Sequence, residues 1–271
     1  MHTRPIPSSG TPLPVIGCGT WLGFDVGNAA SEKPQRGEVL AELFAGGGTL
    51  IDSSPMYGSA ELVVGELLHA SRSRERAFLA TKVWTTGRQP GVEQMERSMG
   101  LLRTRHIELM QVHNLVDWRT HLPTLREWKV GKRISYIGVT HYTESGYTEL
   151  EHVMRSEPLD FVQLNYSMES PEAQRRLLPL AAERGIAVLV NLPLGGGKML
   201  RALHAKPLPG WAAEIGCTAW SQVMLKFVLS QPAVTCAIPG TSNPRHMREN
   251  AVAGTGELPS PSFWAGKLPQ L

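Results

Sequence analysis

Short β-branched apolar runs alternate with amphipathic stretches from one end of the chain to the other. Within the amphipathic stretches, apolar residues recur at helical spacing; Val92, Met95, Met99 and Leu102, for example, would share one helix face. This alternation is typical of α/β proteins. The apolar runs predict eight strands: Val15–Trp21, Thr49–Ser54, Ala77–Val83, Glu108–Asn114, Ile134–Tyr142, Phe161–Met168, Ala187–Leu194 and Val234–Gly240.

The spacing of these runs indicates how the elements are arranged. From Thr49 onward, successive strand starts lie 26 to 31 residues apart, until a longer interval of 47 residues precedes the last strand. Eight repeated βα units predict a (β/α)8 TIM barrel that takes up residues 1–271 as a single domain, without a linker. The Gly- and Pro-rich segment 195–216 is expected to form a long loop over the barrel mouth, and residues 6–10 a turn in an N-terminal β-hairpin that closes the barrel bottom.

Composition and charge narrow the class of protein. The 271 residues carry 27 basic and 24 acidic side chains, a net charge of +3, with no block of like charges, so there is no electrostatic case for nucleic acid or an anionic membrane as partner. The three cysteines form no CxxC or Cys/His pattern, which predicts neither a disulfide framework nor a structural zinc and favours a reducing compartment. No apolar run is long enough for a signal peptide or a membrane span. We therefore expect a cytoplasmic protein, although a removed export leader would leave no trace in this sequence.

Polar residues occupy the C-terminal ends of nearly all the predicted strands, where a barrel of this kind carries its active site. Taken singly, Asp52 would cap a turn, Lys82 would extend toward solvent, and His113 would be a hydrogen-bonded core residue. Together with Tyr57, however, they converge from adjacent strands onto one end of the barrel. Burying four such groups without partners would cost several kcal/mol, so a single shared site is the simplest interpretation.

The acidities of these groups indicate the chemistry. A tyrosine hydroxyl has a pKa of about 10, and we expect the Lys82 ammonium to lower the pKa of Tyr57 so that it can donate a proton. Asp52 would keep Lys82 charged, and His113 would donate a hydrogen bond to a carbonyl oxygen. Such a set protonates an oxygen on which negative charge develops, as when hydride adds to an aldehyde or ketone. The hydride must come from a cofactor, and no metal is required.

The usual phosphate-binding fingerprints are absent from the chain, because Gly17-x-Gly19 and Gly195-Gly-Gly-Lys198 both lack the residues that complete them. An anion site is instead predicted after the last strand, where Asn243 as N-cap and Pro244 at the first helical position would open a helix whose free N–H groups face a phosphate. The alternative is an ordinary capped helix.

At these residues the sequence resembles the aldo-keto reductase superfamily over nearly its whole length. The resemblance implies that Asp52, Tyr57, Lys82 and His113 are the catalytic tetrad with Tyr57 as the general acid. It also implies a nicotinamide dinucleotide bound in an extended conformation without a Rossmann fold. The matching pieces are Gly17-Cys-Gly-Thr-Trp21, Ile51-Asp-Ser-Ser-Pro-Met-Tyr-Gly-Ser59, Ala80-Thr-Lys82, Glu108-Leu-Met-Gln-Val-His-Asn114, Ile137-Gly-Val-Thr140, Phe161-Val-Gln-Leu-Asn-Tyr166 and Ile238-Pro-Gly-Thr-Ser-Asn243.

The chain departs from the family pattern at four cofactor positions. Asn191 stands where many members stack a tyrosine under the nicotinamide, and His141 stands where they place an asparagine. Gly240 and His246 replace a lysine and an arginine aimed at the adenosine 2′-phosphate, and Arg245 is our candidate replacement, so NADP(H) is favoured and NAD(H) is the alternative. The cofactor contacts predicted by the resemblance and the anion site are Gly19, Thr20, Trp21, Asp52, Thr140, His141, Gln163, Asn191, Leu192, Leu194, Gly195, Gly240, Thr241, Ser242, Asn243, Arg245, His246, Glu249 and Asn250.

The predicted substrate is a small-molecule carbonyl compound, and the predicted function is its NAD(P)H-dependent reduction to an alcohol. Trp21, Trp84 and Trp118 would line the pocket with Tyr57 and His113, the alternative for each Trp being a place in the core. Short segments around the mouth predict a pocket open to bulky carbonyls. Two other functions stay open: a dinucleotide-binding sensor or regulatory subunit without turnover, and a lyase that forms a Schiff base on Lys82, which a charge-pairing Asp52 disfavours. The sequence gives neither the physiological substrate nor the oligomeric state.

Overall fold

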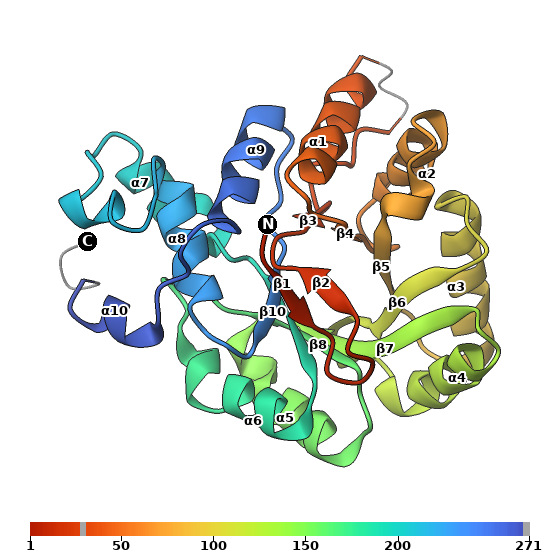
Figure 1. Ribbon diagram of the computed structural model, residues 1–271. Helices are drawn as coiled ribbons and strands as arrows, with labels where there is room; N and C mark the ends of the chain where they lie inside the picture. The colour runs from red at the N-terminus through yellow and green to blue at the C-terminus, as the bar shows by residue number, and fades with distance from the viewer. Residues whose placement is uncertain (28–30, 268–271) are drawn as a thin grey trace.

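A parallel sheet of eight strands forms the centre of the computed structural model, which describes residues 1–27 and 31–267 (Figure 1). Each strand pairs with its neighbours in chain order. The sheet closes into a barrel because Ile16 pairs with Ala237, and Gly19 with Gly240, across the seam between the first and last strands. The expected (β/α)8 fold is therefore confirmed. Its strands are β3 (Cys18–Gly19), β4 (Leu50–Asp52), β5 (Phe78–Val83), β6 (Ile107–Val112), β7 (Ile134–His141), β8 (Phe161–Asn165), β9 (Ala187–Asn191) and β10 (Val234–Ala237).

Several strands end earlier than the sequence pattern predicts. β6 stops at Val112, and His113–Leu115 form a 3-10 turn in which Asn114 has a φ of 52°. β8 ends at Asn165 rather than Met168, and β9 at Asn191 rather than Leu194. The polar residues at these ends leave the hydrogen-bonded ladder and turn into the loops, so they lie at the C-terminal rim of the barrel.

Helices surround the barrel on its outer side (Figure 1). Met95 and Met99 of α3 and Leu102, which directly follows the helix, are buried, and Val92 packs against the same core, as the helical spacing predicts. Buried Glu61 of α2 connects this layer to the sheet, because it accepts hydrogen bonds from Thr81 Oγ1 at 2.5 Å and from Ser98 Oγ at 3.0 Å. The helices are α1 (Lys33–Ala45), α2 (Ala60–Ala70), α3 (Arg88–Leu101), α4 (Trp118–Val130), α5 (Tyr147–Ser156), α6 (Leu177–Arg184), α7 (Lys198–Leu203), α8 (Trp220–Leu229), α9 (Pro244–Ala253) and α10 (Pro261–Ala265).

An N-terminal hairpin crosses one end of the barrel (Figure 1). Its strands β1 (Thr3–Pro5) and β2 (Pro12–Pro14) pair antiparallel, and residues 6–11 connect them. Ile6 and Leu13 are fully buried in a cluster that includes Leu50 and Phe161 from the barrel strands. The expected closure of the barrel bottom is thus present, and the chemistry is left to the opposite end.

The segment expected as a long loop over the mouth is partly helical. It contains a 3-10 turn at Gly195–Gly197, helix α7 and a second 3-10 turn at Gly210–Ala212. α7 contacts α8 on the outside of the barrel (Figure 1). The loop was expected from the Gly and Pro content of the segment. However, residues 198–203, between the glycines and the prolines, are good helix formers, and Leu203 and Trp211 are buried.

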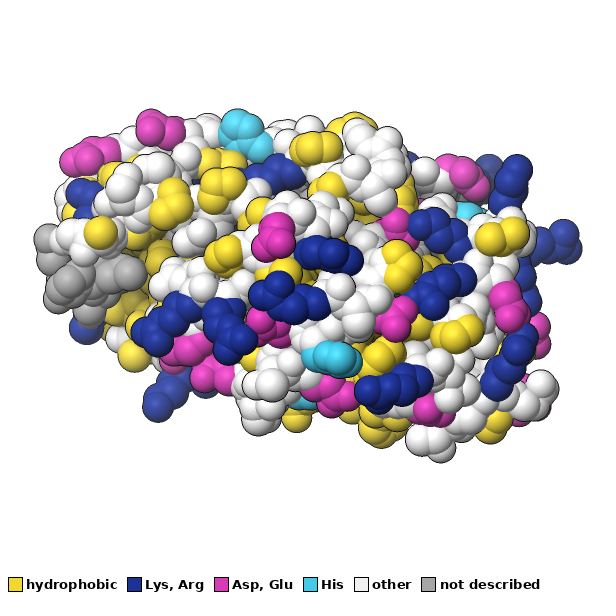
Figure 2. Space-filling model, turned by 90° about the horizontal axis from the view of Figure 1, so that it is seen from below, with side chains coloured by type: hydrophobic (Ala, Val, Ile, Leu, Met, Phe, Trp, Pro, Cys, Tyr) yellow, Lys and Arg dark blue, Asp and Glu magenta, His cyan; other side chains and the backbone are white. Residues whose placement is uncertain are grey.

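Basic and acidic side chains are interspersed on the face formed by α4, α5 and α6 (Figure 2). The ion pairs of these helices include Arg126 with Glu157, and Arg155 and Arg176 with Glu151. Within residues 1–27 and 31–267, no helix combines the length and apolar character needed to span a membrane.

Candidate active site

Four ionisable side chains meet at the C-terminal end of the barrel, as the sequence predicts. Asp52 is the last residue of β4, and Lys82 lies near the end of neighbouring β5. His113 follows β6 directly, and Tyr57 lies in the turn between β4 and α2. The parallel pairing of β4, β5 and β6 brings these strand ends to one rim.

Lys82 and Asp52 form a buried ion pair at the centre of this site. Lys82 Nζ lies 2.7 Å from Asp52 Oδ2 and donates a second hydrogen bond, also of 2.7 Å, to the carbonyl oxygen of Ser53. Gln163 Nε2 donates to Asp52 Oδ2 at 3.1 Å, and Gln111 Nε2 approaches Oδ1 at 3.4 Å. Because the carboxylate is held from several sides, the ammonium is fixed in one place.

The ion pair determines the protonation state of Lys82. Burial has the largest single effect and lowers the pKa of this ammonium, but the interactions with Asp52 and Tyr57 together outweigh it, so the pKa of Lys82 is raised. A Schiff-base lysine must be neutral to attack a carbonyl. The raised pKa therefore disfavours the lyase alternative.

The Tyr57 ring lies close to both the Lys82 ammonium and the His113 imidazole. Lys82 Nζ is 5.1 Å from the ring centroid, and the His113 ring meets the Tyr57 ring edge-on at 5.8 Å between centroids. The expectation of a lowered pKa was wrong for this structure: burial raises the pKa of Tyr57, and the opposing effect of Lys82 is smaller. Tyr57 is consequently a protonated phenol at neutral pH, with a cation beside it.

His113 is a neutral imidazole in this environment. Burial, followed by the positive charge of Lys82, lowers the pKa of His113 to about 2. Its Nδ1 lies 2.9 Å from Ser54 Oγ, and its ring lies 6.5 Å from the Trp84 ring between centroids. The imidazole therefore contributes hydrogen bonding rather than charge.

Several predicted cofactor residues line the rim beside this site. Thr140 is buried at the end of β7, while the His141 ring stacks on Tyr142 and its Nδ1 faces the backbone of Thr143. Asn191 and Asn165 lie side by side in the register of β9 and β8, and the Oδ1 atom of each is buried without a hydrogen-bond partner among the residues that the structure describes. Buried acceptors left unpaired are costly, so these two oxygens are suited to an amide donor from outside the chain.

The seam between β3 and β10 brings two backbones into close approach. A Cβ on Gly19 would meet the carbonyl oxygen of Ile238 at 3.0 Å, and one on Gly240 would meet the carbonyl oxygen of Gly19 at 3.3 Å. Thr20, predicted as a cofactor contact, is fully buried, and its Oγ1 lies within hydrogen-bond distance, 3.0 Å, of both the Asp52 carbonyl oxygen and Ser53 Oγ. Its side chain braces the end of β4.

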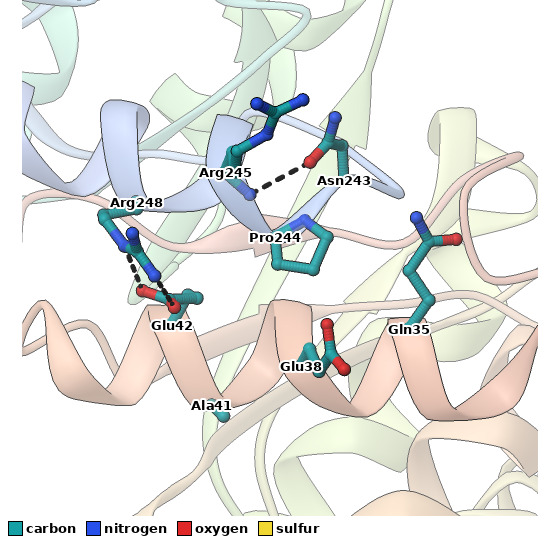
Figure 3. Close-up of a pocket in the computed structure, with 8 residues that line it drawn as sticks. All are labelled: Gln35, Glu38, Ala41, Glu42, Asn243, Pro244, Arg245 and Arg248. Atoms are coloured by element: carbon teal, nitrogen blue, oxygen red, sulfur yellow. Dashed lines mark hydrogen bonds and ion pairs between the residues drawn. The ribbon is translucent and has the colours of Figure 1, made fainter.

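The predicted helix cap after β10 is present. Asn243 Oδ1 accepts the backbone N–H of Arg245 at 3.0 Å, and Pro244 is the first residue of α9 (Figure 3). A groove of about 490 Å³ separates this helix start from α1. Arg248 forks onto the Glu42 carboxylate of α1, whereas the exposed Arg245 forms none of the ion pairs found within the described residues.

The remaining predicted contacts occupy varied positions. Leu192 has a φ of 47° directly after β9, and the Glu169 side chain packs against Gly195. Thr241 Oγ1 accepts the backbone N–H of Asn243 at 3.1 Å. Among the others, Leu194 is half-buried, Asn250 is buried, and the exposed ones are Ser242, His246 and Glu249.

The three tryptophans predicted to line the substrate pocket separate into two groups. Trp21 and Trp84 are 52% and 41% exposed, and Trp84 lies beside His113 at the rim. Trp118 is buried between α4 and α5, where its Nε1 donates to Glu149 at 3.1 Å. Its placement in the helical layer follows the ordinary behaviour of a large apolar ring and favours the core alternative for this residue.

Sequence reasoning gave no role to Gln111, Ser54 or Asn165. Each lies at a strand end whose polar character was noticed, but only the fold shows that Gln111 reaches Asp52, that Ser54 reaches His113 and that Asn165 lies beside Asn191. A polar residue at the inward-facing position of a barrel strand was the available signal.

Fold and site together define a (β/α)8-barrel enzyme of the oxidoreductase class, and the comparisons with known proteins agree. Residues 15–264 match the model of the aldo/keto reductase family. The chain belongs to the aldo/keto reductase family.

Individual relatives show how far the likeness extends. Methylglyoxal reductase YeaE of Escherichia coli is 30% identical over 258 residues, which cover 92% of this chain and 88% of that protein. Aldo-keto reductase YhdN of Bacillus subtilis is 29% identical over 206 residues, covering 70% and 61%. The solved aldo/keto reductase from Klebsiella pneumoniae, in complex with NADP and acetate, has the same fold, with a TM-score of 0.82, 23% identity and coverage of 100% of this chain and 95% of that one.

Proposed function

We propose that this protein reduces the carbonyl group of an aldehyde or ketone to an alcohol, with Tyr57 as the general acid. The observation that carries the proposal is the buried Lys82 ammonium, held 2.7 Å from Asp52 and 5.1 Å from the Tyr57 ring. A phenol that stays protonated at neutral pH, beside a fixed cation, can give up its proton when negative charge develops on a carbonyl oxygen.

Each side chain has a separate part in this chemistry. A bound nicotinamide dinucleotide supplies the hydride. Tyr57 delivers the proton to the carbonyl oxygen, and Lys82 stabilises the phenolate that remains. Asp52 keeps Lys82 charged and in place, and the neutral His113 orients the carbonyl by a hydrogen bond.

The rim is suited to such a cofactor. The unpaired Oδ1 atoms of Asn165 and Asn191 can accept the N–H groups of a carboxamide, although Asn191 cannot stack on a ring as a tyrosine would. At the other end, the positive end of the α9 helix dipole favours a phosphate, with Pro244 carrying no N–H and the Arg245 N–H bonded to Asn243. We favour NADP(H) because exposed Arg245 is available for a 2′-phosphate, and the similar K. pneumoniae protein was solved with NADP; NAD(H) is the alternative.

The substrate class is a small carbonyl compound, and the exposed rings of Trp21 and Trp84 leave the rim open to bulky or aromatic ones. The relative named methylglyoxal reductase makes a small ketoaldehyde a natural first substrate to test. A panel should therefore run from methylglyoxal to aromatic aldehydes, ketones and quinones.

The test is to mix the purified protein with NADPH, and separately with NADH, and to follow cofactor oxidation with and without each carbonyl. We expect oxidation that depends on the carbonyl and gives the corresponding alcohol. Tight cofactor binding without oxidation across the whole panel would contradict the proposal and favour the sensor alternative.

A further inference from the structure

Ser54 is the buried partner of the imidazole in the candidate active site. It lies two residues beyond the end of β4, and its side chain is fully buried. Ser54 Oγ is 2.9 Å from His113 Nδ1 and also accepts the backbone N–H of Met56 at 3.3 Å. His113 Nε2 forms no hydrogen bond with any of the described residues, so one ring nitrogen is engaged and the other is free for a ligand.

The donors and acceptors at Ser54 fit only one arrangement of hydrogens. A neutral imidazole carries one ring proton, on either Nδ1 or Nε2. If Nδ1 carried it, that N–H and the Met56 N–H would both point at Ser54 Oγ, and the buried hydroxyl hydrogen would have no acceptor among the described residues. If Ser54 donates to Nδ1 instead, every one of these hydrogens is satisfied.

We propose that Ser54 is a positioning residue, which donates its hydroxyl hydrogen to His113 Nδ1 and thereby holds the imidazole in the tautomer that carries its proton on Nε2. This tautomer leaves an N–H donor available to a carbonyl oxygen; the opposite tautomer would present a lone pair and repel it. The catalytic consequence rests on the proposed function, whereas the tautomer itself does not.

The tautomer can be observed directly by ¹⁵N NMR of protein labelled at its nine histidines, with His113→Gln used to assign the His113 signals. In the wild type we expect the shift of a protonated nitrogen at Nε2 and of an unprotonated nitrogen at Nδ1. A protonated Nδ1 in the wild type would overturn the proposal, whatever any variant does.

Variants then separate positioning from a merely structural role. Ser54→Ala should give mixed or reversed tautomer signals, and Ser54→Thr should restore them because it keeps the hydroxyl. Ser53→Ala is the matched control for the signals, since Ser53 Oγ bonds Thr20 and not the imidazole. Unchanged tautomer signals in a folded Ser54→Ala protein would also contradict the proposal.

Kinetics measure the consequence for carbonyl reduction. Ser54→Ala should lower kcat/KM roughly 2- to 12-fold, the factor that corresponds to one neutral hydrogen bond, with unchanged cofactor affinity and with rescue by Ser54→Thr. If the wild type reduces no carbonyl yet shows the Nε2 tautomer, the proposed function fails and the role of Ser54 in setting the tautomer stands. If the wild type reduces carbonyls but His113 carries its proton on Nδ1, the proposed function stands and the role of Ser54 in setting the tautomer fails.

Discussion

At the scale of single residues, burial rather than neighbouring charge sets the acid–base state of Tyr57 and His113. Tyr57 illustrates this, because its adjacent ammonium was expected to dominate, yet burial raises the pKa of the phenol. Burial also disfavours the charged form of His113, and for a cationic acid this lowers the pKa instead of raising it. Both groups are therefore neutral at physiological pH, and the fixed cation is Lys82.

The neutral state of His113 predicts how stability depends on pH. The pKa of His113 is about 2 in the folded protein and about 6.5 in the unfolded chain, so its contribution to stability is complete above pH 6.5 and is lost as the pH falls. Between pH 7 and pH 5 the wild type should lose about 2 kcal/mol more unfolding free energy than His113→Gln. Urea unfolding of both proteins at the two pH values measures this difference, and parallel losses would contradict it.

At the scale of elements, the sequence predicted features set by neighbouring residues, but not contacts between residues far apart in the chain. Asn243 and Pro244 predict the start of α9, and the helix cap is present as predicted. The sequence pattern also located the strands, but not where the polar ends leave the ladder, because Asn114 adopts its positive φ only in the folded turn. Nor could it show that Arg248 pairs with Glu42, which lies 206 residues away in the chain.

The pairing of Arg248 with Glu42 gives a specific prediction for cofactor choice at α9. Arg245→Ala should weaken NADPH binding roughly tenfold or more, and NADH binding much less, because it removes a charge-assisted hydrogen bond to the 2′-phosphate. Arg248→Ala, on the same helix, should have a smaller effect because its guanidinium is engaged by Glu42. Titration by quenching of tryptophan fluorescence measures both, and equal NADPH and NADH affinities untouched by Arg245→Ala would remove 2′-phosphate recognition from this helix.

At the scale of the whole molecule, one end of the barrel is closed by the buried hairpin, and the opposite end carries the candidate active site. The regular spacing of strands predicted the closed barrel, and a Gly-containing turn beside Ile6 predicted the hairpin beneath it. The helical character of α7 escaped prediction, because its packing against α8 depends on contacts that Gly and Pro content does not reveal.

The buried hairpin should therefore matter for folding and not for catalysis. Ile6→Ala should lower the unfolding free energy by about 2–5 kcal/mol, because it leaves a cavity in the core of the barrel bottom, while the activity per folded molecule stays unchanged. Val130→Ala is the control, since Val130 is 85% exposed and its truncation should have little effect. Denaturant unfolding compares the two, and equal stabilities would show that the hairpin does not contribute to the core.

The central claim for the molecule is that Tyr57 gives the proton in carbonyl reduction, and Tyr57→Phe tests it most directly. Tyr136→Phe is the control, because it removes a phenol hydroxyl at the barrel bottom, where Tyr136 bonds Thr11. With cofactor affinity measured separately by fluorescence titration, Tyr57→Phe should reduce the rate of carbonyl reduction about 10²- to 10⁴-fold while leaving NADPH affinity unchanged. A Tyr57→Phe protein that keeps half of the wild-type rate would contradict the account and remove Tyr57 from the mechanism.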